Sequence, residues 1–259
     1  MTDRRWLWIV CALALAPSAA EARPRKPKPH GAAPASPATR PPAAAPAAAP
    51  GSPTAASVVA SVEAYYRTFS EAKIAFTQTV TNVTFGTTKT VAGTLYLKKP
   101  GRMRWIYQGK PQAGKPTTSR EFISDGKLLY LIDHDNQELV EKELATSVLP
   151  TVITFLDGQG DLAAEFTPSL VPPKPDPAGA PADLVLRLVP KVPSATYRSL
   201  ELVVDRADHH VEASTVIDAA DNSTRFDFGA ADLSGKRDDG FFTVDPTSPA
   251  LARYRLIEP

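Results

Sequence analysis

The chain has 259 residues, with 29 Lys and Arg against 28 Asp and Glu, which gives a formal net charge of +1. This near balance excludes the strong basic excess of a nucleic-acid-binding protein, so we expect no nucleic acid partner. Because Cys11 is the only cysteine, the chain has no internal disulfide and no site built from several cysteine ligands.

The first 22 residues are arranged like a secretory signal peptide. Arg4 and Arg5 precede an apolar run over residues 6–16, and small residues follow as far as Ala22. The run has about 11 residues, whereas a membrane-spanning helix needs about 20. We therefore expect a cleaved signal peptide over residues 1–22 and export to the periplasm. A permanent N-terminal anchor is the alternative.

Cys11 lies inside this apolar run. A lipidated cysteine usually follows a small residue and has Leu three positions before it, but Trp8, Ile9 and Val10 precede Cys11. We expect Cys11 to leave with the signal peptide, so that the mature chain has no cysteine for a redox or metal site.

Residues 23–56 consist mainly of Pro and Ala with a few basic side chains. Without larger apolar side chains, such a segment cannot bury enough surface to offset the entropy lost on ordering. We expect a disordered, polyproline-like tether here. One domain then follows over residues 57–259, long enough to form one sizeable core.

An amphipathic helix is expected to open this domain. Val58, Val62, Tyr65 and Phe69 recur at spacings of three and four residues, which places them on one helical face. Ser57 precedes this stripe and is the expected N-cap.

A long series of strands is expected after the helix. From Ile74 to Val80, large side chains alternate with small ones or Thr, a period of two that is typical of a strand with one buried face. Further runs are bounded by turn residues such as Asp125-Gly126, which suits a two-residue hairpin. These runs are Thr90–Lys98, Arg102–Gln108, Arg120–Ser124, Lys127–Asp133, Glu138–Glu143, Leu162–Thr167, Leu184–Val189, Ser199–Asp205, Val211–Asp218, Thr224–Phe228 and Phe241–Val244.

Two segments interrupt the strands. Residues 146–156 are rich in large apolar side chains and precede Asp157-Gly158, so a short apolar helix is predicted there. The Pro-rich stretch 168–181 is predicted to be a loop. Together these elements predict an α+β domain of about eleven antiparallel strands. A sheet of that size must curl or close, with the helices against one concave, apolar face.

The most informative strand is the one over residues 102–108. Alternation places Met103, Trp105 and Tyr107 on one face, with Arg102 and Arg104 on the other. Met and large aromatics suit a pocket for variable hydrocarbon, because they adapt or offer flat apolar area. The same pattern is equally typical of an ordinary core, so this pattern alone leaves both interpretations open.

A set of short motifs, in order, resembles the outer-membrane lipoprotein carrier (LolA) family over about residues 57–246. Each motif is weak by itself, and together they are fairly specific behind a signal peptide. The motifs are Phe76-x-Gln78, Gly93-x-Leu95-x-Leu97, Lys99-Pro100-Gly101-Arg102-Met103-Arg104-Trp105, Ser124-Asp125-Gly126-Lys127, Leu188-Val189-Pro190-Lys191 and Phe242-x-Val244-Asp245-Pro246.

The resemblance implies an incomplete β-barrel whose open mouth is covered by helices. It implies a periplasmic carrier, expected to be a monomer, that holds the acyl chains of lipoproteins. Such a carrier receives its load from an inner-membrane lipoprotein-releasing ABC transporter and passes it to an outer-membrane lipoprotein acceptor. A lipid or lipoprotein sensor, or another envelope lipid-binding module of the same fold, is the alternative.

The resemblance also implies the positions of the site. The expected acyl-cavity residues are Phe76, Leu95, Leu97, Met103, Trp105 and Tyr107. The family commonly has Arg directly before the Pro, where it hydrogen-bonds to lid-helix carbonyls and holds the empty carrier shut. Here that position is Lys99, which lacks the planar fork of Arg.

Arg102 and Arg104 are candidates to replace this latch, or are solvated charges on the sheet face. The lid role is expected to fall on the opening helix and on the 146–156 helix, or both helices plug the core permanently. The lid side chains of the second helix are Leu149, Val152, Ile153 and Phe155.

Nothing in the sequence indicates an enzyme. The motifs G-x-S-x-G and H-E-x-x-H are absent, and so is a phosphate-binding loop. His134 and the pair His209-His210 lie in expected polar turns at spacings that match no known metal-ligand pattern. We therefore expect no catalytic residues, no metal and no cofactor.

Overall fold

The structure is a computed structural model that describes residues 53–144, 161–172, 183–194 and 196–257. Within these residues, twelve strands form one sheet in the order β12-β6-β5-β4-β3-β2-β1-β11-β10-β9-β8-β7. The strands are β1 (Glu71–Asn82), β2 (Thr87–Lys98), β3 (Arg102–Gln108), β4 (Thr118–Asp125), β5 (Leu128–Asp133), β6 (Glu138–Glu143), β7 (Phe166–Val171), β8 (Leu184–Pro190), β9 (Ser199–Val204), β10 (Val211–Ile217), β11 (Ser223–Phe228) and β12 (Arg255–Ile257).

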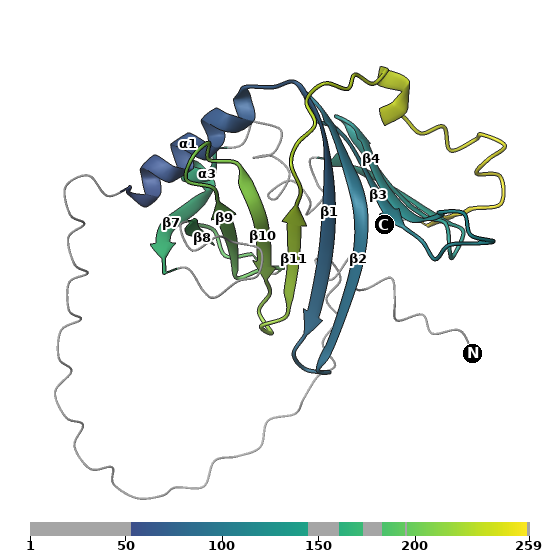
Figure 1. The fold of residues 1–259 in the computed structure, drawn as a ribbon. Helices are drawn as coiled ribbons and strands as arrows, with labels where there is room; N and C mark the ends of the chain where they lie inside the picture. The colour runs from purple at the N-terminus through teal and green to yellow at the C-terminus, as the bar shows by residue number, and fades with distance from the viewer. Residues whose placement is uncertain (1–52, 145–160, 173–182, 195, 258–259) are drawn as a thin grey trace, which may run out of the picture.

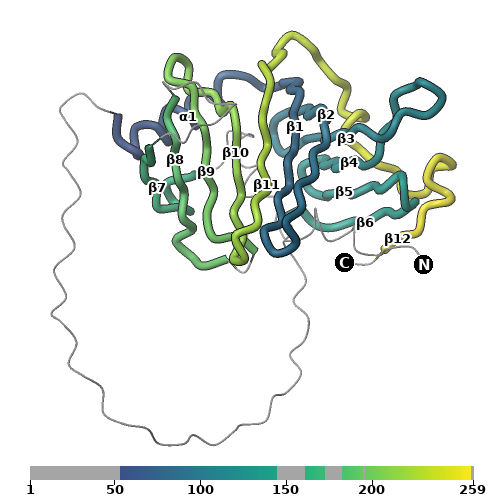
Figure 2. Tube along the Cα trace, turned by 60° about the horizontal axis from the view of Figure 1, so that its bottom comes forward, coloured from purple at the N-terminus to yellow at the C-terminus, as the bar shows by residue number. Residues whose placement is uncertain are grey.

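The sheet is curled and open. β7 and β12 are its two edges, so it does not close into a full barrel. The long hairpin β1–β2 occupies the middle of the sheet (Figures 1 and 2). Strands β7 to β11 lie on one side of it, and strands β3 to β6 with β12 lie on the other. Neighbouring strands are antiparallel except β12, which lies parallel to β6. The predicted α+β class and incomplete antiparallel barrel are thus confirmed, with twelve strands instead of about eleven.

One face of the sheet, here called the inner face, carries the main core. In β1, Ala72, Ile74, Phe76 and Gln78 are buried and alternate with more exposed residues. The residues that pair with them across β2 and β11 lie on the same face, because directly opposite side chains in antiparallel strands do so. A continuous apolar layer therefore crosses the sheet on its inner side.

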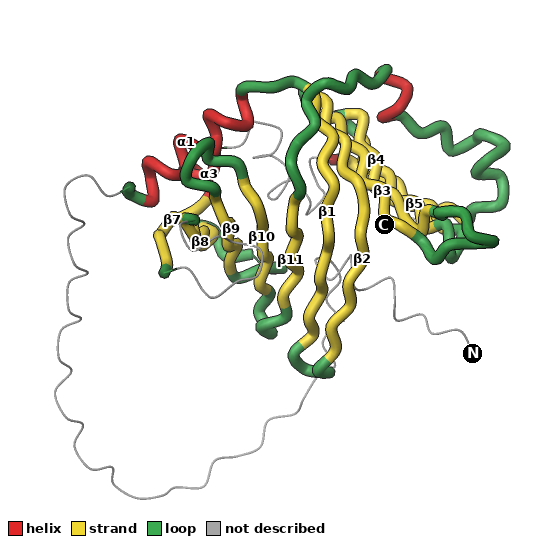
Figure 3. Tube along the Cα trace, in the orientation of Figure 1, coloured by secondary structure: helices red, strands yellow, loops and turns green. Residues whose placement is uncertain are grey.

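Helix α1 (Ala55–Arg67) lies against this inner face near one end of the sheet (Figure 3). Val58, Val59, Val62 and Tyr66 are its buried stripe and join the main core. The prediction that Ser57 is the N-cap is wrong. Thr54 is the N-cap and accepts from the Ser57 backbone N–H, while the Ser57 hydroxyl accepts from the Thr54 backbone N–H, which makes a capping box.

The region after residue 160 differs from the prediction of one strand over Leu162–Thr167. The first part is a short helix, α3 (Leu162–Glu165), capped by the Asp161 side chain, and β7 begins only at Phe166. Pro168, predicted to begin a loop, is inside β7 and pairs with Leu188. An edge strand tolerates this Pro because the missing N–H leaves no ladder partner unsatisfied on the open side.

The C-terminal segment covers part of the opposite, outer face. The predicted strand Phe241–Val244 is wrong, because Asp239–Phe242 forms a 3-10 helix, η3. Beyond η3, Val244, Leu251 and Tyr254 pack against a second cluster of buried residues. These are Ile123, Tyr130, Ile132 and Leu139, on β4, β5 and β6.

The other predicted strands are confirmed to within three residues at each end. The predicted helix over residues 146–156, and most of the predicted loop over 168–181, lie outside the described residues. In the described part of the chain, no helix is both long and apolar enough to cross a membrane.

Candidate functional site

The strand register lines up apolar side chains in a row across the inner face. Trp105 of β3 lies directly opposite Leu95 on one side and Phe122 on the other. The row continues to Ile74 of β1 and to Leu131 of β5. This row of apolar side chains spans five neighbouring strands and is part of the main core.

All six residues predicted to line an acyl site lie on this inner face and are buried. Their exposed fractions range from 0 to 4% for Phe76, Leu95, Leu97, Met103, Trp105 and Tyr107. The ring of Phe76 makes edge-to-face contacts with Trp105 and Tyr107, at 5.1 Å between centroids in each case. The sequence therefore located one contiguous cluster, and its role in ligand binding stays a prediction.

Gly93 makes this cluster possible. It pairs with Phe76 on one side and with Tyr107 on the other, on the inner face. A Cβ atom at Gly93 would lie 2.3 Å from the Phe76 ring and 2.5 Å from the carbonyl oxygen of Ile106. The missing side chain leaves the space into which the Phe76 ring extends.

Three aromatic members of the same cluster were missed at the sequence level. Phe226 contacts Trp105 at 5.4 Å and Phe76 at 5.9 Å between ring centroids. Phe228 stacks beside Phe226, and Phe122 contacts Tyr107 at 5.7 Å. Alternation in residues 224–228 places Phe226 and Phe228 on one strand face, but only the pairing of β11 with β1 brings them to Phe76.

Lys99 connects the end of β2 to the C-terminal end of helix α1. Its Nζ donates to the carbonyl oxygens of Tyr66 and of Phe69, the latter at 2.7 Å. The ammonium group also lies 4.3 Å from the centre of the Phe69 ring, a cation–π contact. A cation at the C-terminal end of a helix is favourable because unpaired carbonyls carry partial negative charge there.

Two further contacts hold helix α1 in place. The Tyr66 hydroxyl accepts from the backbone N–H of Val211, at 3.3 Å, and the Glu63 carboxylate accepts from the backbone N–H of Leu162, at 2.9 Å. Burial raises the pKa of the Tyr66 hydroxyl, which is therefore neutral at physiological pH. The helix is thus attached to the sheet and to α3 by directional bonds as well as by its apolar stripe.

Arg102 and Arg104 lie on the outer face, and their described contacts lead away from α1. Arg104 pairs with Glu121 at 2.6 Å, donates to the Phe241 carbonyl oxygen at 3.0 Å and lies over the Phe241 ring. Arg102 lies 3.5 Å from Asp239. Of the three cations considered for the latch, Lys99 is the one whose described contacts reach helix α1.

The sequence of residues 67–245 matches the family described as "Outer membrane lipoprotein carrier protein LolA". The chain belongs to the LolA family. Among its relatives, an outer-membrane lipoprotein carrier protein of Methylobacillus flagellatus is 27% identical over 107 residues, or 41% of this chain and 49% of the relative. The outer-membrane lipoprotein carrier protein of Nitrosospira multiformis is 24% identical over 106 residues, or 41% of this chain and 48% of the relative. The chain thus spans about half the length of these two relatives.

Solved structures of similar fold include a LolA superfamily protein from Nitrosomonas europaea. It has a TM-score of 0.40 and 11% identity, and the match covers 74% of this chain and 99% of that one. An uncharacterized conserved protein from Thermus thermophilus has a TM-score of 0.47 and 11% identity. That match covers 79% of this chain and 99% of the Thermus protein.

The remaining residues predicted for the lid of this LolA-family chain are Leu149, Val152, Ile153 and Phe155. All four lie outside the described residues. The described part of the predicted lid is therefore helix α1 alone.

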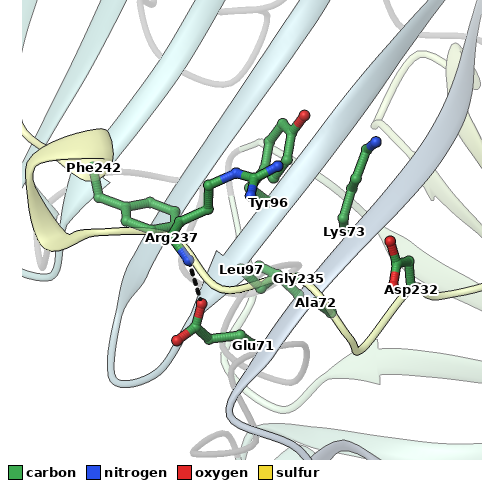
Figure 4. A pocket seen from close by; sticks show the side chains of 9 residues that line it. All are labelled: Glu71, Ala72, Lys73, Tyr96, Leu97, Asp232, Gly235, Arg237 and Phe242. Atoms are coloured by element: carbon green, nitrogen blue, oxygen red, sulfur yellow. Dashed lines mark hydrogen bonds between the residues drawn. The ribbon is translucent and has the colours of Figure 1, made fainter.

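A small cavity lies where the ends of β1 and β2 meet the segment that leads into η3 (Figure 4). Its volume is about 60 Å³. Its lining is mixed, and Arg237 closes one side by donating its backbone N–H to Glu71 at 2.9 Å. A cavity of this size and polarity does not suit an acyl chain.

Three carboxylates come together near the turn between β9 and β10. Asp183, Asp205 and Glu212 each place one oxygen within 4.8 Å of the others. Burial, together with a hydrogen bond to Asp183, raises the pKa of Glu212. Oxygen ligands suit a hard cation, but acidic clusters also occur without one, and we assign this cluster no role.

Proposed function

We propose that this LolA-family chain is a periplasmic carrier that shields the acyl chains of lipoproteins, without catalysing a reaction. The observation that carries the proposal is the continuous apolar and aromatic inner face, with Trp105 at its centre. A helix fastened by Lys99 covers part of that face. Expected partners are acylated lipoproteins, an inner-membrane ABC transporter that releases them and an outer-membrane acceptor.

The energetics of a lipid in water explain why a carrier needs such a face. An acyl chain of about 16 carbons costs roughly 13 kcal/mol to expose, at about 0.8 kcal/mol per CH₂ group. A lipoprotein that crosses an aqueous space must therefore keep its chains covered. The inner-face row from Ile74 to Leu131 offers apolar contacts across five strands.

A carrier must also release its load. In the structure the aromatic side chains of the inner face contact one another, as Phe76 does with Trp105 and Tyr107. A ligand that enters would exchange these internal contacts for contacts with hydrocarbon, at small net free energy. Lys99 would oppose entry by holding the end of helix α1, and its hydrogen bonds would be lost when the helix moves.

Tryptophan fluorescence gives a direct test. The sequence has three Trp residues, and two of them, Trp6 and Trp8, lie in the expected signal peptide. A chain that begins at Arg23 therefore reports from Trp105 alone. We expect its emission to shift when a diacylated lipopeptide is added, and to stay constant with the same peptide lacking acyl chains. Unchanged emission with the acylated peptide would contradict the proposal.

A test in cells complements the fluorescence assay. The full chain is purified from the periplasm and analysed by mass spectrometry. We expect acylated protein to co-purify with wild type, and less of it with Leu95→Asp, which places a charge in the apolar row. The matched control is Thr94→Asp, on the same strand but facing the outer side. Equal recovery from all three chains would count against the proposed site.

A further inference from the structure

Two buried polar groups on the inner face have no hydrogen-bond partner among the described residues. They are the indole Nε1 of Trp105 and the hydroxyl Oγ of Ser214. Trp105 is 4% exposed and Ser214 is fully buried. The indole N–H can only donate, and the hydroxyl can donate or accept.

Both groups lie beside one aromatic ring, that of Phe226. Ser214 of β10 is directly opposite Phe226 of β11, so the two side chains share the inner face. The Trp105 ring is 5.4 Å from the Phe226 ring, in an edge-to-face contact. The unpaired donors therefore flank the same ring, one from the β3 side and one from the β10 side.

Packing alone does not explain these two residues. Phe would supply an aromatic ring at position 105 without an N–H group, and Ala would fit at position 214 without a hydroxyl. A buried polar group without a partner opposes folding, and a fully buried apolar replacement avoids this penalty. Side chains beside them include Phe226, Phe76 and Leu202, which have no acceptor. The buried amide of Gln78, opposite Phe226, makes no hydrogen bond with either group. A ligand bound within the apolar layer would supply an acceptor to both groups.

We propose that Trp105 Nε1 and Ser214 Oγ donate hydrogen bonds to the ester carbonyl oxygens of an acylated ligand. This inference rests on the proposed function and adds to it a specificity for ester-linked acyl chains over chains without a carbonyl. An ester carbonyl is a neutral acceptor at the head of a hydrocarbon chain. The chain lies on the apolar row, while its carbonyl reaches the two neutral donors beside Phe226.

The test compares two synthetic lipopeptides that differ only in the linkage. One carries two hexadecanoyl chains on an S-glyceryl cysteine through ester bonds, and the other carries two hexadecyl chains through ether bonds. A fluorophore on the peptide reports binding by anisotropy, so the readout does not depend on Trp105. A neutral hydrogen bond is equivalent to roughly threefold to tenfold in affinity, and wild type should therefore prefer the ester probe.

Conservative variants then assign the preference to the two donors. Trp105→Phe and Ser214→Ala should each weaken binding of the ester probe by roughly threefold to tenfold and leave the ether probe nearly unchanged. The double variant should bind both probes equally. The control is Tyr96→Phe, which removes a hydroxyl on the outer face, next to Phe241, and should change neither affinity.

The outcomes separate this inference from the proposed function. If wild type binds both probes equally, the ester inference is wrong and the carrier proposal stands. The ester inference is also wrong if Trp105→Phe weakens both probes to the same extent, because the ring then acts only by packing. If wild type binds neither probe, the carrier proposal fails and the inference fails with it.

Discussion

Lys99 Nζ lies 2.7 Å from the carbonyl oxygen of Phe69, so a side chain at the end of β2 is bonded to the backbone just beyond helix α1. The same ammonium group also donates to the Tyr66 carbonyl oxygen. The Tyr66 carbonyl is in the last turn of the helix and the Phe69 carbonyl lies just beyond the C-cap, and Lys99 donates to both. The family resemblance led us to expect such a latch at this position.

Lys99→Met should loosen the helix without removing the apolar stem of the side chain. We expect the free energy of unfolding to fall by about 1 to 3 kcal/mol, because hydrogen bonds from a charged donor are lost. Loading of an acylated lipopeptide should become faster, measured by stopped-flow fluorescence. Lys99→Arg should keep the free energy of unfolding and the loading rate near wild type, since Arg can donate to two carbonyls at once. Lys110→Met, at an exposed loop position, is the control. Identical loading rates in wild type and Lys99→Met would end the latch hypothesis.

Gly93→Ala should disrupt the aromatic cluster. Its Cβ would lie 2.3 Å from the Phe76 ring and 2.5 Å from a backbone oxygen that cannot easily move. We expect a loss of about 1 to 3 kcal/mol in the free energy of unfolding, typical of overpacking in a core. Chemical denaturation followed by circular dichroism measures it. Gly240→Ala is the matched control, because nothing lies within 4 Å of its added Cβ. Equal midpoints for the two variants would contradict the packing argument.

The sequence predicted those parts of the inner face that show as alternation of side chains within a single strand. Alternation in β3 places Met103, Trp105 and Tyr107 on one face, and the structure buries all three. A period of two is a property of the strand itself, so a few residues suffice to reveal it. The same alternation is present in β11, where Phe226 and Phe228 were nevertheless not assigned to the site, because their neighbours lie more than a hundred positions away in the sequence.

Errors in the prediction arose where tertiary contacts or caps decide the outcome. The segment Phe241–Val244 has the composition of a strand, but its aromatic rings pack on Arg104 and on each other, and it forms η3. The apolar stripe begins at Val58 and so indicates an N-cap at Ser57, whereas Thr54 forms the cap one turn earlier. The sequence could not show that Trp105 Nε1 and Ser214 Oγ lack a partner among the described residues, since hydrogen bonding depends on the whole fold.

Ser214→Ala should stabilise the unloaded protein. The Ser214 hydroxyl is fully buried and has no partner among the described residues, so its removal relieves a desolvation penalty of about 1 kcal/mol. Ser124→Ala is the matched control, since Ser124 is also fully buried but accepts from the Gly126 backbone N–H at 3.0 Å. The control should lose about 1 kcal/mol. Thermal unfolding of the lipid-free protein measures both, and changes of the same sign in the two variants would refute the assignment.

The pairing of Glu121 on the outer face predicts how stability depends on acid pH. Burial alone would raise the pKa of this carboxyl, but hydrogen bonds from His134 and from Arg104 hold the pKa below its ordinary value of 4.5. His134 in turn bonds to the Tyr254 hydroxyl at 2.7 Å, so the network joins β4 to the C-terminal segment. A carboxylate of this kind stabilises the folded state only while it is ionised.

Glu121→Gln should therefore make the free energy of unfolding less dependent on pH in acid. In the folded state Glu121 stays ionised to lower pH than in the unfolded chain, so its contribution is complete above about 4.5 and is lost as pH falls below that value. Unfolding in urea between pH 3 and pH 7 should show a steeper loss for wild type than for Glu121→Gln. The exposed Glu165→Gln is the control and should follow wild type. If Glu121→Gln keeps the full wild-type slope below pH 4.5, another carboxylate governs the acid sensitivity and the role assigned to this pair is wrong.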